Sequence, residues 1–149
     1  MIVIRRAKID DAAAIAALAA VLGYPADPVV MSQRLRRVLP REDQRVFLAE
    51  DAQQRPCGWL TAHCFDTLAS GFRVQITGLV VAETHRRQGV GRMLVNEAEA
   101  WAKKIGAEAV VVFSNVTRME SHSFYPALGY TNIKTEAVYR KNLTLSSPA

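Results

Sequence analysis

The segment Arg86-Arg87-Gln88-Gly89-Val90-Gly91-Arg92 decides how the rest of the sequence is interpreted. It follows the apolar run 76–81 and opens a helical pattern. Backbone N–H groups at a helix N-terminus have no intrahelical partner and carry the positive end of the helix dipole, so they attract phosphate. The glycines let a phosphate approach bare backbone, and the arginines add charge that hydrogen-bonds phosphate oxygens. The segment therefore predicts a pyrophosphate loop, with a basic turn before a helix as the alternative.

Two other glycine-rich phosphate loops fit this segment poorly. A dinucleotide-binding fingerprint needs a third Gly or Ala and a later acidic residue, and a P-loop needs Gly-Lys followed by Ser or Thr. Here Gly91 is followed by Arg92 and Met93. Neither alternative loop is therefore expected.

The composition is that of one ordinary globular domain. The chain has 149 residues, of which 50% are hydrophobic, so it has enough apolar side chains for a full core. We expect a single domain over residues 1–149. The longest apolar run, 12–22, is too short to span a bilayer, and the N-terminus does not read as a secretion signal. These features predict a soluble, cytoplasmic protein that does not bind membranes.

The charged residues and cysteines exclude other classes of function. The formal net charge is +5, but the basic residues occur in scattered pairs without the aromatic-interleaved stripe of a nucleic-acid-binding surface. Cys57 and Cys64 are spaced to lie on opposite faces of one strand, so no disulfide is expected. The histidines and cysteines lack metal-ligand spacing. We therefore expect no nucleic-acid partner and no metal.

Hydrophobic periodicity and turn residues predict an α/β protein in which a mixed sheet has helices on both faces. The segments 45–50 and 57–65 predict an antiparallel hairpin. The segments 72–81 and 108–113, joined through a helix, predict a parallel pair. Strands are expected at 2–4, 45–50, 57–65, 72–81, 108–113, 130–133 and 136–143, and helices at 10–22 (capped by Asp10-Asp11), 28–39, 89–105 and 118–128.

The loop resembles the Arg/Gln-x-x-Gly-x-Gly/Ala motif of the GCN5-related N-acetyltransferase (GNAT) family. The segment Phe124-Tyr125-Pro126-Ala127-Leu128-Gly129-Tyr130 resembles the family's Phe-Tyr-x-x-x-Gly-Phe segment, with Tyr130 in place of Phe. The likeness covers nearly the whole chain. It implies the acyl-CoA N-acyltransferase fold, a mixed and mostly antiparallel sheet that is splayed between two parallel strands.

The resemblance implies acetyl-CoA as co-substrate and direct transfer of its acetyl group to a primary amine. The loop residues Arg86, Arg87, Gln88, Gly89, Val90, Gly91 and Arg92 would bind the pyrophosphate. Backbone N–H groups of Leu79, Val80 and Val81 would receive the pantetheine arm and polarise the acetyl carbonyl, and the Asn115 side chain would hydrogen-bond that arm. Tyr125 would lie beside the sulfur, where a protonated phenol can act as general acid.

The base that takes the proton of the amine is less well specified. Glu83 follows directly on the central strand, and we rank it ahead of the other candidates, which are His85, Glu120 and His122. In many family members, chains of water molecules take this proton from the amine. The resemblance also places an acceptor site beside the connection at Gly23-Tyr24-Pro25, although these residues predict a bend in any case.

The sequence leaves several alternatives open. The protein could transfer a larger acyl group from another acyl-CoA, or bind acetyl-CoA as a regulatory module without turnover. A basic nucleic-acid-binding domain is the third and least favoured option. Neither the acceptor nor the oligomeric state is specified, so a homodimer stays open.

Overall fold

The computed structural model describes residues 1–114 and 119–144, with Met119 described by its backbone alone. The chain divides into two compact units, Met1–Phe113 and Ser114–Ala149, and each is described by itself. No helix in the described ranges is both long and apolar enough to cross a membrane.

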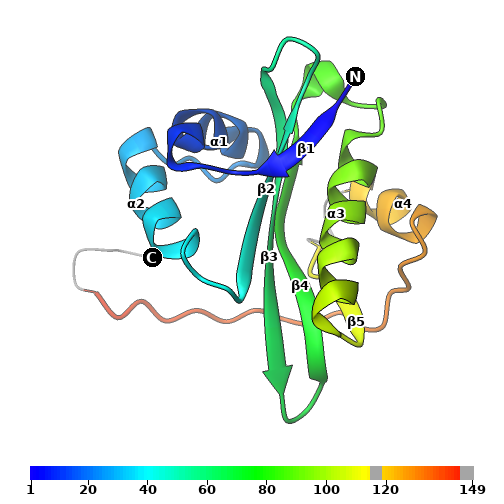
Figure 1. The fold of residues 1–149 in the computed structure, drawn as a ribbon. Helices are drawn as coiled ribbons and strands as arrows, with labels where there is room; N and C mark the ends of the chain where they lie inside the picture. Colours follow the sequence, from blue (N-terminus) through cyan, green and yellow to red (C-terminus); the bar gives the residue numbers. More distant parts are fainter. Residues whose placement is uncertain (115–118, 145–149) are drawn as a thin grey trace. The chain divides into compact units, whose positions relative to one another are not determined.

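The first unit contains a five-stranded sheet (Figure 1). The strands follow chain order, and each pairs antiparallel with the next except β4 and β5, which are parallel. The predicted mixed, mostly antiparallel sheet is therefore confirmed. The strand bounds are β1 Val3–Arg6, β2 Gln44–Glu50, β3 Pro56–Thr67, β4 Gly71–Val81 and β5 Ala109–Val112.

The two parallel strands separate part-way along their length. Pairing runs from Arg73 with Ala109 to Ile76 with Val112, whereas β4 continues to Val81. At the point of separation Thr77 is an extra residue, because Ile76 pairs with Ala62 and Gly78 pairs with Thr61. A bulge of this kind bends its strand and interrupts the ladder. The predicted separation of the two parallel strands therefore begins at a β-bulge in β4.

Helices cover both faces of the sheet in this unit, as predicted (Figure 1). On one face lie α1 (Ala12–Ala19) and α2 (Pro28–Val38), and the Trp59 indole donates a hydrogen bond to the Ile15 carbonyl at 3.2 Å. On the other lies α3 (Val90–Ile105), whose buried residues are Val90, Leu94, Val95, Ala98, Trp101 and Ala102. A Cβ on Gly58 would be 2.9 Å from the Val80 carbonyl oxygen and 3.3 Å from Leu94 Cδ1, so only glycine permits this close packing.

Two aspartates predicted to cap helices behave differently. Asp27 caps α2 by accepting the Val30 N–H at 2.8 Å, and Pro28 is the first helical residue. Asp11, predicted to cap the first helix, instead accepts the Lys8 N–H at 2.7 Å and the Arg5 guanidinium at 2.8 Å. The bond from Lys8 belongs to the capping box of a short 3₁₀ turn, η1 (Ile9–Asp11), ahead of α1. Asp11 therefore occupies the predicted capping position before α1, but its side chain does not cap that helix.

The second unit contains the predicted helix, α4 (Met119–Ala127). Gly129, at φ +92°, ends it in a Schellman motif, with N–H groups of Gly129 and Tyr130 bonded to the carbonyls of Pro126 and Tyr125. The strands predicted at 130–133 and 136–143 are wrong, since those residues are in neither strand nor helix. A strand persists only where a neighbour takes up its backbone hydrogen bonds, and no described strand pairs with this segment.

Candidate functional site

The predicted phosphate loop lies between β4 and α3. After β4 the chain forms a 3₁₀ turn, η3 (Glu83–His85), and then reaches Gly89, the residue before the helix. The first helical hydrogen bond of α3 runs from the Met93 N–H to the Gly89 carbonyl at 3.0 Å. No side chain caps this helix, and its first turn contains no acidic residue. The N–H groups of its first turn are therefore available to an anion.

Glycine at position 89 is required by the backbone. Gly89 has φ +78° and ψ +12°, a left-handed conformation that strains residues with a side chain. A Cβ there would meet nothing within 4 Å, so the space beside Gly89 is open. Gly91 lies within the first helical turn and has no positive φ. The Val90 side chain is buried, so this residue can offer a ligand only its backbone N–H.

Positive charge surrounds the open helix end. Arg86, Arg87 and Arg92 are exposed, and no ion pair of theirs forms within residues 1–114 and 119–144. Arg87 has φ +67°, a left-handed conformation that is uncommon for a residue with a side chain. The Gln88 amide is the exception in this segment, since it reaches back to the Thr84 carbonyl at 3.5 Å. Among the residues that the structure describes, the loop thus presents three guanidinium groups without an ion pair beside the N–H groups of the first helical turn.

The end of β4 offers free backbone groups next to this loop. In an antiparallel pair, the N–H and C=O groups of successive residues point alternately toward and away from the partner strand. The Ala82 N–H bonds to the Cys57 carbonyl at 2.8 Å, so the backbone of Val80 also faces β3. The backbones of Leu79 and Val81 therefore face the side on which β5 no longer pairs. The Val80 side chain, only 3% exposed, fills the core.

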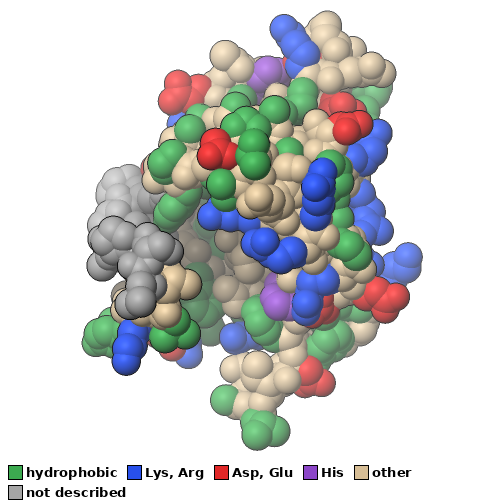
Figure 2. Space-filling view, turned by 90° about the vertical axis from the view of Figure 1, so that its left-hand side faces the viewer, with side chains coloured by type: hydrophobic (Ala, Val, Ile, Leu, Met, Phe, Trp, Pro, Cys, Tyr) green, Lys and Arg blue, Asp and Glu red, His purple; other side chains and the backbone are tan. Residues whose placement is uncertain are grey.

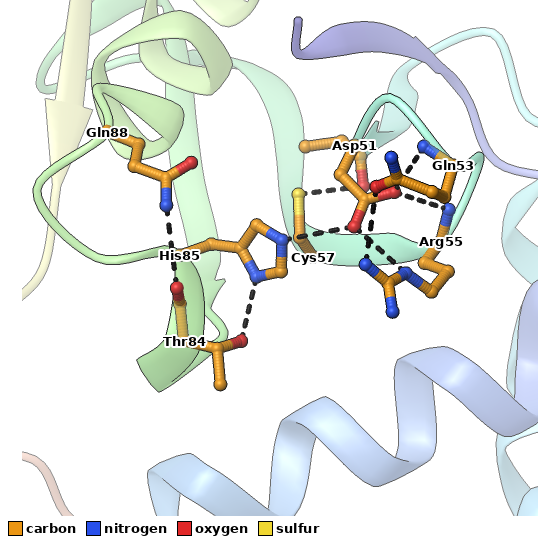
Figure 3. Close-up of polar contacts among 8 residues, drawn as sticks. Asp51, Gln53, Arg55, Cys57, Thr84, His85 and Gln88 are labelled. Carbon is orange, nitrogen blue, oxygen red and sulfur yellow. Dashed lines mark hydrogen bonds and ion pairs between the residues drawn. The ribbon is translucent and has the colours of Figure 1, made fainter.

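A polar network that the sequence did not predict holds the turn before the loop (Figure 3). His85 Nε2 lies 3.2 Å from Asp51 Oδ2, and His85 Nδ1 lies 2.8 Å from the Thr84 hydroxyl. Asp51 belongs to the turn between β2 and β3 and is only 8% exposed. The turn composition predicted a bend there, but no sequence signal links residues 34 positions apart.

The sequence between residues 13 and 130 matches the family model described as "Acetyltransferase (GNAT) family". The matched range is more than half of the chain and includes the phosphate loop and Tyr125. The chain belongs to the acetyltransferase (GNAT) family.

Individual relatives and structures agree with this membership. An aminoglycoside N(6′)-acetyltransferase type 1 of Serratia marcescens is 29% identical over 46% of this chain and 47% of that protein, so the match spans about half of the relative. An uncharacterized N-acetyltransferase of Bacillus subtilis (strain 168) is 32% identical over 66% of this chain and 70% of its own length. The structure of AAC(6′)-Iy with the bisubstrate analog CoA-S-monomethyl-acetylneamine shares the fold, with a TM-score of 0.84, 18% identity and coverage of 95% and 99%.

The remaining candidate residues of this GNAT protein are placed as follows. Glu83, ranked first as base, is exposed in η3 directly after β4. His85 is engaged with Asp51 and Thr84, as described above. Glu120 and His122 are exposed on α4, and Asn115 lies outside the described residues. No group of three His, Cys, Asp or Glu side chains that could hold a metal ion occurs in the part of the chain that the structure describes.

Tyr125 lies in an aromatic cluster of the second unit. Its ring contacts those of Phe124 and Tyr130 edge-on, with centroids 4.9 and 5.9 Å apart. The Schellman motif at Gly129 brings Tyr130 back toward Tyr125, which explains why aromatic residues flank the glycine at this spacing. Burial raises the pKa of the Tyr125 phenol above its usual value near 10, so the hydroxyl is protonated at neutral pH.

The connection between α1 and α2 contains a hollow of about 500 Å³. Its lining is apolar apart from Asp27, whose carboxylate already caps α2. The lining residues are Ala13, Ala16, Ala17, Ala20, Pro25, Ala26, Asp27 and Pro28, and none belongs to the phosphate loop. An acceptor site beside this connection stays a prediction.

Proposed function

We propose that this protein is an acetyl-CoA-dependent N-acetyltransferase that transfers the acetyl group directly to a primary amine. The observation that carries the proposal is the uncapped N-terminus of α3, which follows a left-handed glycine and stands next to the free edge of β4. We also propose that residues 1–149 form one catalytic domain, because the family match crosses the boundary between the two units.

The residues of this chain fit the charge and shape of the coenzyme. The first-turn N–H groups of α3, with Arg86, Arg87 and Arg92, would bind the pyrophosphate. The backbones of Leu79 and Val81 would hydrogen-bond the pantetheine arm and orient the thioester carbonyl. AAC(6′)-Iy, which shares this fold, binds an analog that contains CoA. Asn115 would contribute a further hydrogen bond to the arm.

The reaction needs two proton transfers that side chains can supply. The amine nitrogen forms a bond to the acetyl carbon, the carbon–sulfur bond breaks, and the thiolate takes up a proton. We assign donation of that proton to Tyr125, whose raised pKa keeps it protonated. Glu83, exposed at the end of β4, would accept the proton that the amine loses, directly or through water.

The acceptor is not identified, but the charge of the protein bears on its chemistry. Relatives named aminoglycoside acetyltransferases make a polycationic antibiotic one candidate. The face seen in Figure 2 carries many Lys and Arg side chains, and Arg34, Arg36 and Arg37 are exposed on α2 without any acidic residue in that helix. This positive charge favours acceptor molecules whose net charge is zero or negative over polycationic acceptors. A larger acyl group and a non-catalytic acetyl-CoA-binding role remain alternatives.

The proposed function is tested first by acetyl-CoA binding and then by a panel of acceptor amines. Acetyl-CoA should raise the melting temperature, because a ligand that binds only the folded state stabilises it. Other acyl-CoA thioesters, followed by release of free thiol, test the acyl preference. A panel of amino acids, amino sugars, peptides and aminoglycosides then identifies the acceptor. Absence of a coenzyme-dependent shift would contradict the proposal, and a shift without turnover on any amine would favour the regulatory alternative.

Tyr125→Phe tests the proposed general acid, since it removes the hydroxyl and keeps the ring. We expect kcat to fall by roughly 10²-fold while coenzyme affinity changes little. A smaller loss would mean that the thiolate leaves partly without protonation. Because the Tyr125 pKa is raised above its ordinary value near 10, its ionisation should not reduce wild-type activity between pH 6 and about pH 9. An unchanged kcat in Tyr125→Phe across this range would show that Tyr125 is not the general acid.

A further inference from the structure

The buried Asp51 carboxylate is satisfied largely within its own turn. It accepts the Gln53 N–H at 2.9 Å, the Arg55 N–H at 3.0 Å and the Arg55 guanidinium at 3.2 Å. These bonds, led by the one from the Arg55 backbone, together with the one from His85, lower the pKa of Asp51, so it is a carboxylate at neutral pH. Most of the hydrogen bonds to this carboxylate therefore come from its own turn. The bond from His85 is an additional link, and its effect falls mainly on the segment that contains His85.

His85 connects this fixed turn to the start of the phosphate loop. A carboxylate only accepts hydrogen bonds, so His85 Nε2 donates a hydrogen bond to Asp51 at 3.2 Å. His85 Nδ1 forms a second hydrogen bond with the Thr84 hydroxyl, 2.8 Å away. Both ring nitrogens are thus used, and the imidazole, whose side chain is only 19% exposed, is held in one orientation. The same engagement makes it a poor candidate for accepting a substrate proton.

The loop needs such an anchor because one of its residues has a strained backbone. Arg87 has φ +67°, and a left-handed non-glycine residue persists only where its surroundings hold it. Within the described residues, His85 provides the side-chain link from η3 to the β2–β3 turn, immediately before Arg86. Figure 3 shows the link running from Asp51 through His85 to Thr84.

We propose that the Asp51–His85 pair is a positioning device that holds the Arg86–Arg92 loop in its coenzyme-binding conformation. His85 is thereby assigned a positioning role and not the role of a catalytic base. The inference rests on the proposed function, since the loop is taken to bind the pyrophosphate. A preorganised loop binds more tightly because less conformational freedom is lost on binding. The device should therefore control coenzyme affinity more than the rate of acetyl transfer.

Two substitutions at position 85 separate anchoring from packing. His85→Phe keeps a ring of similar size and removes both hydrogen bonds, whereas His85→Gln places an amide N–H close to the position of Nε2. We expect His85→Phe to weaken acetyl-CoA binding by about tenfold, with kcat at saturating coenzyme nearly unchanged. His85→Gln should recover most of the affinity. Equal affinity of His85→Phe and wild type, or no recovery in His85→Gln, would overturn the proposal.

Hydrogen exchange in the absence of coenzyme tests the anchor independently of the proposed function. The amides of residues 86–92 should exchange faster in His85→Phe than in wild type, while those of β2 and β3 stay unchanged. Unchanged exchange in the loop would overturn the anchor, whatever the protein binds. Failure of wild type to bind acetyl-CoA would instead reject the proposed function.

Two further variants provide a fallback and a control. Thr84→Val removes an exposed hydroxyl with little change in shape, so it is expected to fold even if His85→Phe does not. It should accelerate exchange in the loop to a smaller extent, and no acceleration would count against the anchor. Asp11→Asn alters the other buried aspartate, which is paired with Arg5 far along the chain from the loop. It should lower stability without changing exchange at 86–92, and altered exchange there would show that general destabilisation explains the effect.

Discussion

The N-termini of α2 and α3 differ in what compensates their unpaired N–H groups and the positive end of the helix dipole. At α2 the chain supplies its own anion, because the Asp27 carboxylate accepts the Val30 N–H at 2.8 Å. At α3 the residue before the helix is Gly89, no side chain caps the first turn, and Arg92 adds positive charge where the helix dipole is already positive. Two helices in one unit therefore differ in whether their first turn is satisfied by the protein.

This difference identifies the end at which a ligand is expected. Uncapped N–H groups and an unfavourable arginine lower the stability of the free protein, and a bound anion would reverse both effects. The C-terminus of α3 is conventional by contrast, since Gly106 and Ala107 bond back to the Lys103 and Ala102 carbonyls. Within α3, incomplete capping is thus confined to the N-terminal end, which follows the predicted phosphate loop.

For the comparison of the two helix ends, the largest expected effect comes from adding a methyl group at the open end of α3. Gly89→Ala should weaken acetyl-CoA binding by about tenfold or more, equivalent to about 1.4 kcal/mol or more, because Cβ enters the open space beside the helix N-terminus. Titration calorimetry measures the loss. Gly106→Ala is the matched control, because Gly106 has φ +81° and similarly open space at the other end of the same helix. Both variants should lose about 1–2 kcal/mol of stability from left-handed strain. Equal coenzyme affinity in the two variants would contradict the claim that the coenzyme binds at the N-terminus of α3.

Removing the cap of α2 should affect stability alone. Asp27→Ala is expected to lower the free energy of unfolding by about 1 kcal/mol, because the Val30 N–H loses its partner. Urea denaturation measures this change, and Asp27→Ser, which restores a capping oxygen, should recover much of it. Coenzyme affinity should match wild type in both. A loss of coenzyme affinity in Asp27→Ala would mean that the two helix ends are not functionally distinct.

The smallest effects concern charge and should have opposite signs at the two helices. Arg92 lies in the first turn of α3, where its charge opposes the dipole, whereas Arg37 lies in the last turn of α2, where its charge is favourable. In low salt, Arg92→Gln should raise the stability of the free protein and Arg37→Gln should lower it, each by about 0.3–1 kcal/mol. Only Arg92→Gln should also weaken coenzyme binding. Stability changes of the same sign would contradict the electrostatic comparison.

The parts of the fold that were predicted correctly are those fixed by local pattern. Alternation and apolar runs located the five strands of the first unit, and the spacing of Val90, Leu94, Ala98 and Trp101 defined the buried face of α3. Asp27 with Pro28, and Gly106, marked helix ends because capping involves neighbouring residues. The strands predicted after Tyr130 were wrong for the complementary reason. A β pattern says that a segment can pair, whereas pairing itself requires a partner that the pattern does not contain.

By itself, the sequence determined the position of the glycine-containing loop, the helix it opens and the family motifs, because glycine conformation, helix capping and hydrophobic periodicity act over a few residues. The tertiary structure decided which backbone groups of Leu79 and Val81 are free, since that depends on where β5 stops pairing and where Thr77 bulges. It also decided that His85 meets Asp51, a contact across 34 residues that exists only after β2, β3 and β4 have formed one sheet. Local preferences are encoded residue by residue, but contacts between distant segments arise from the packing of the whole unit.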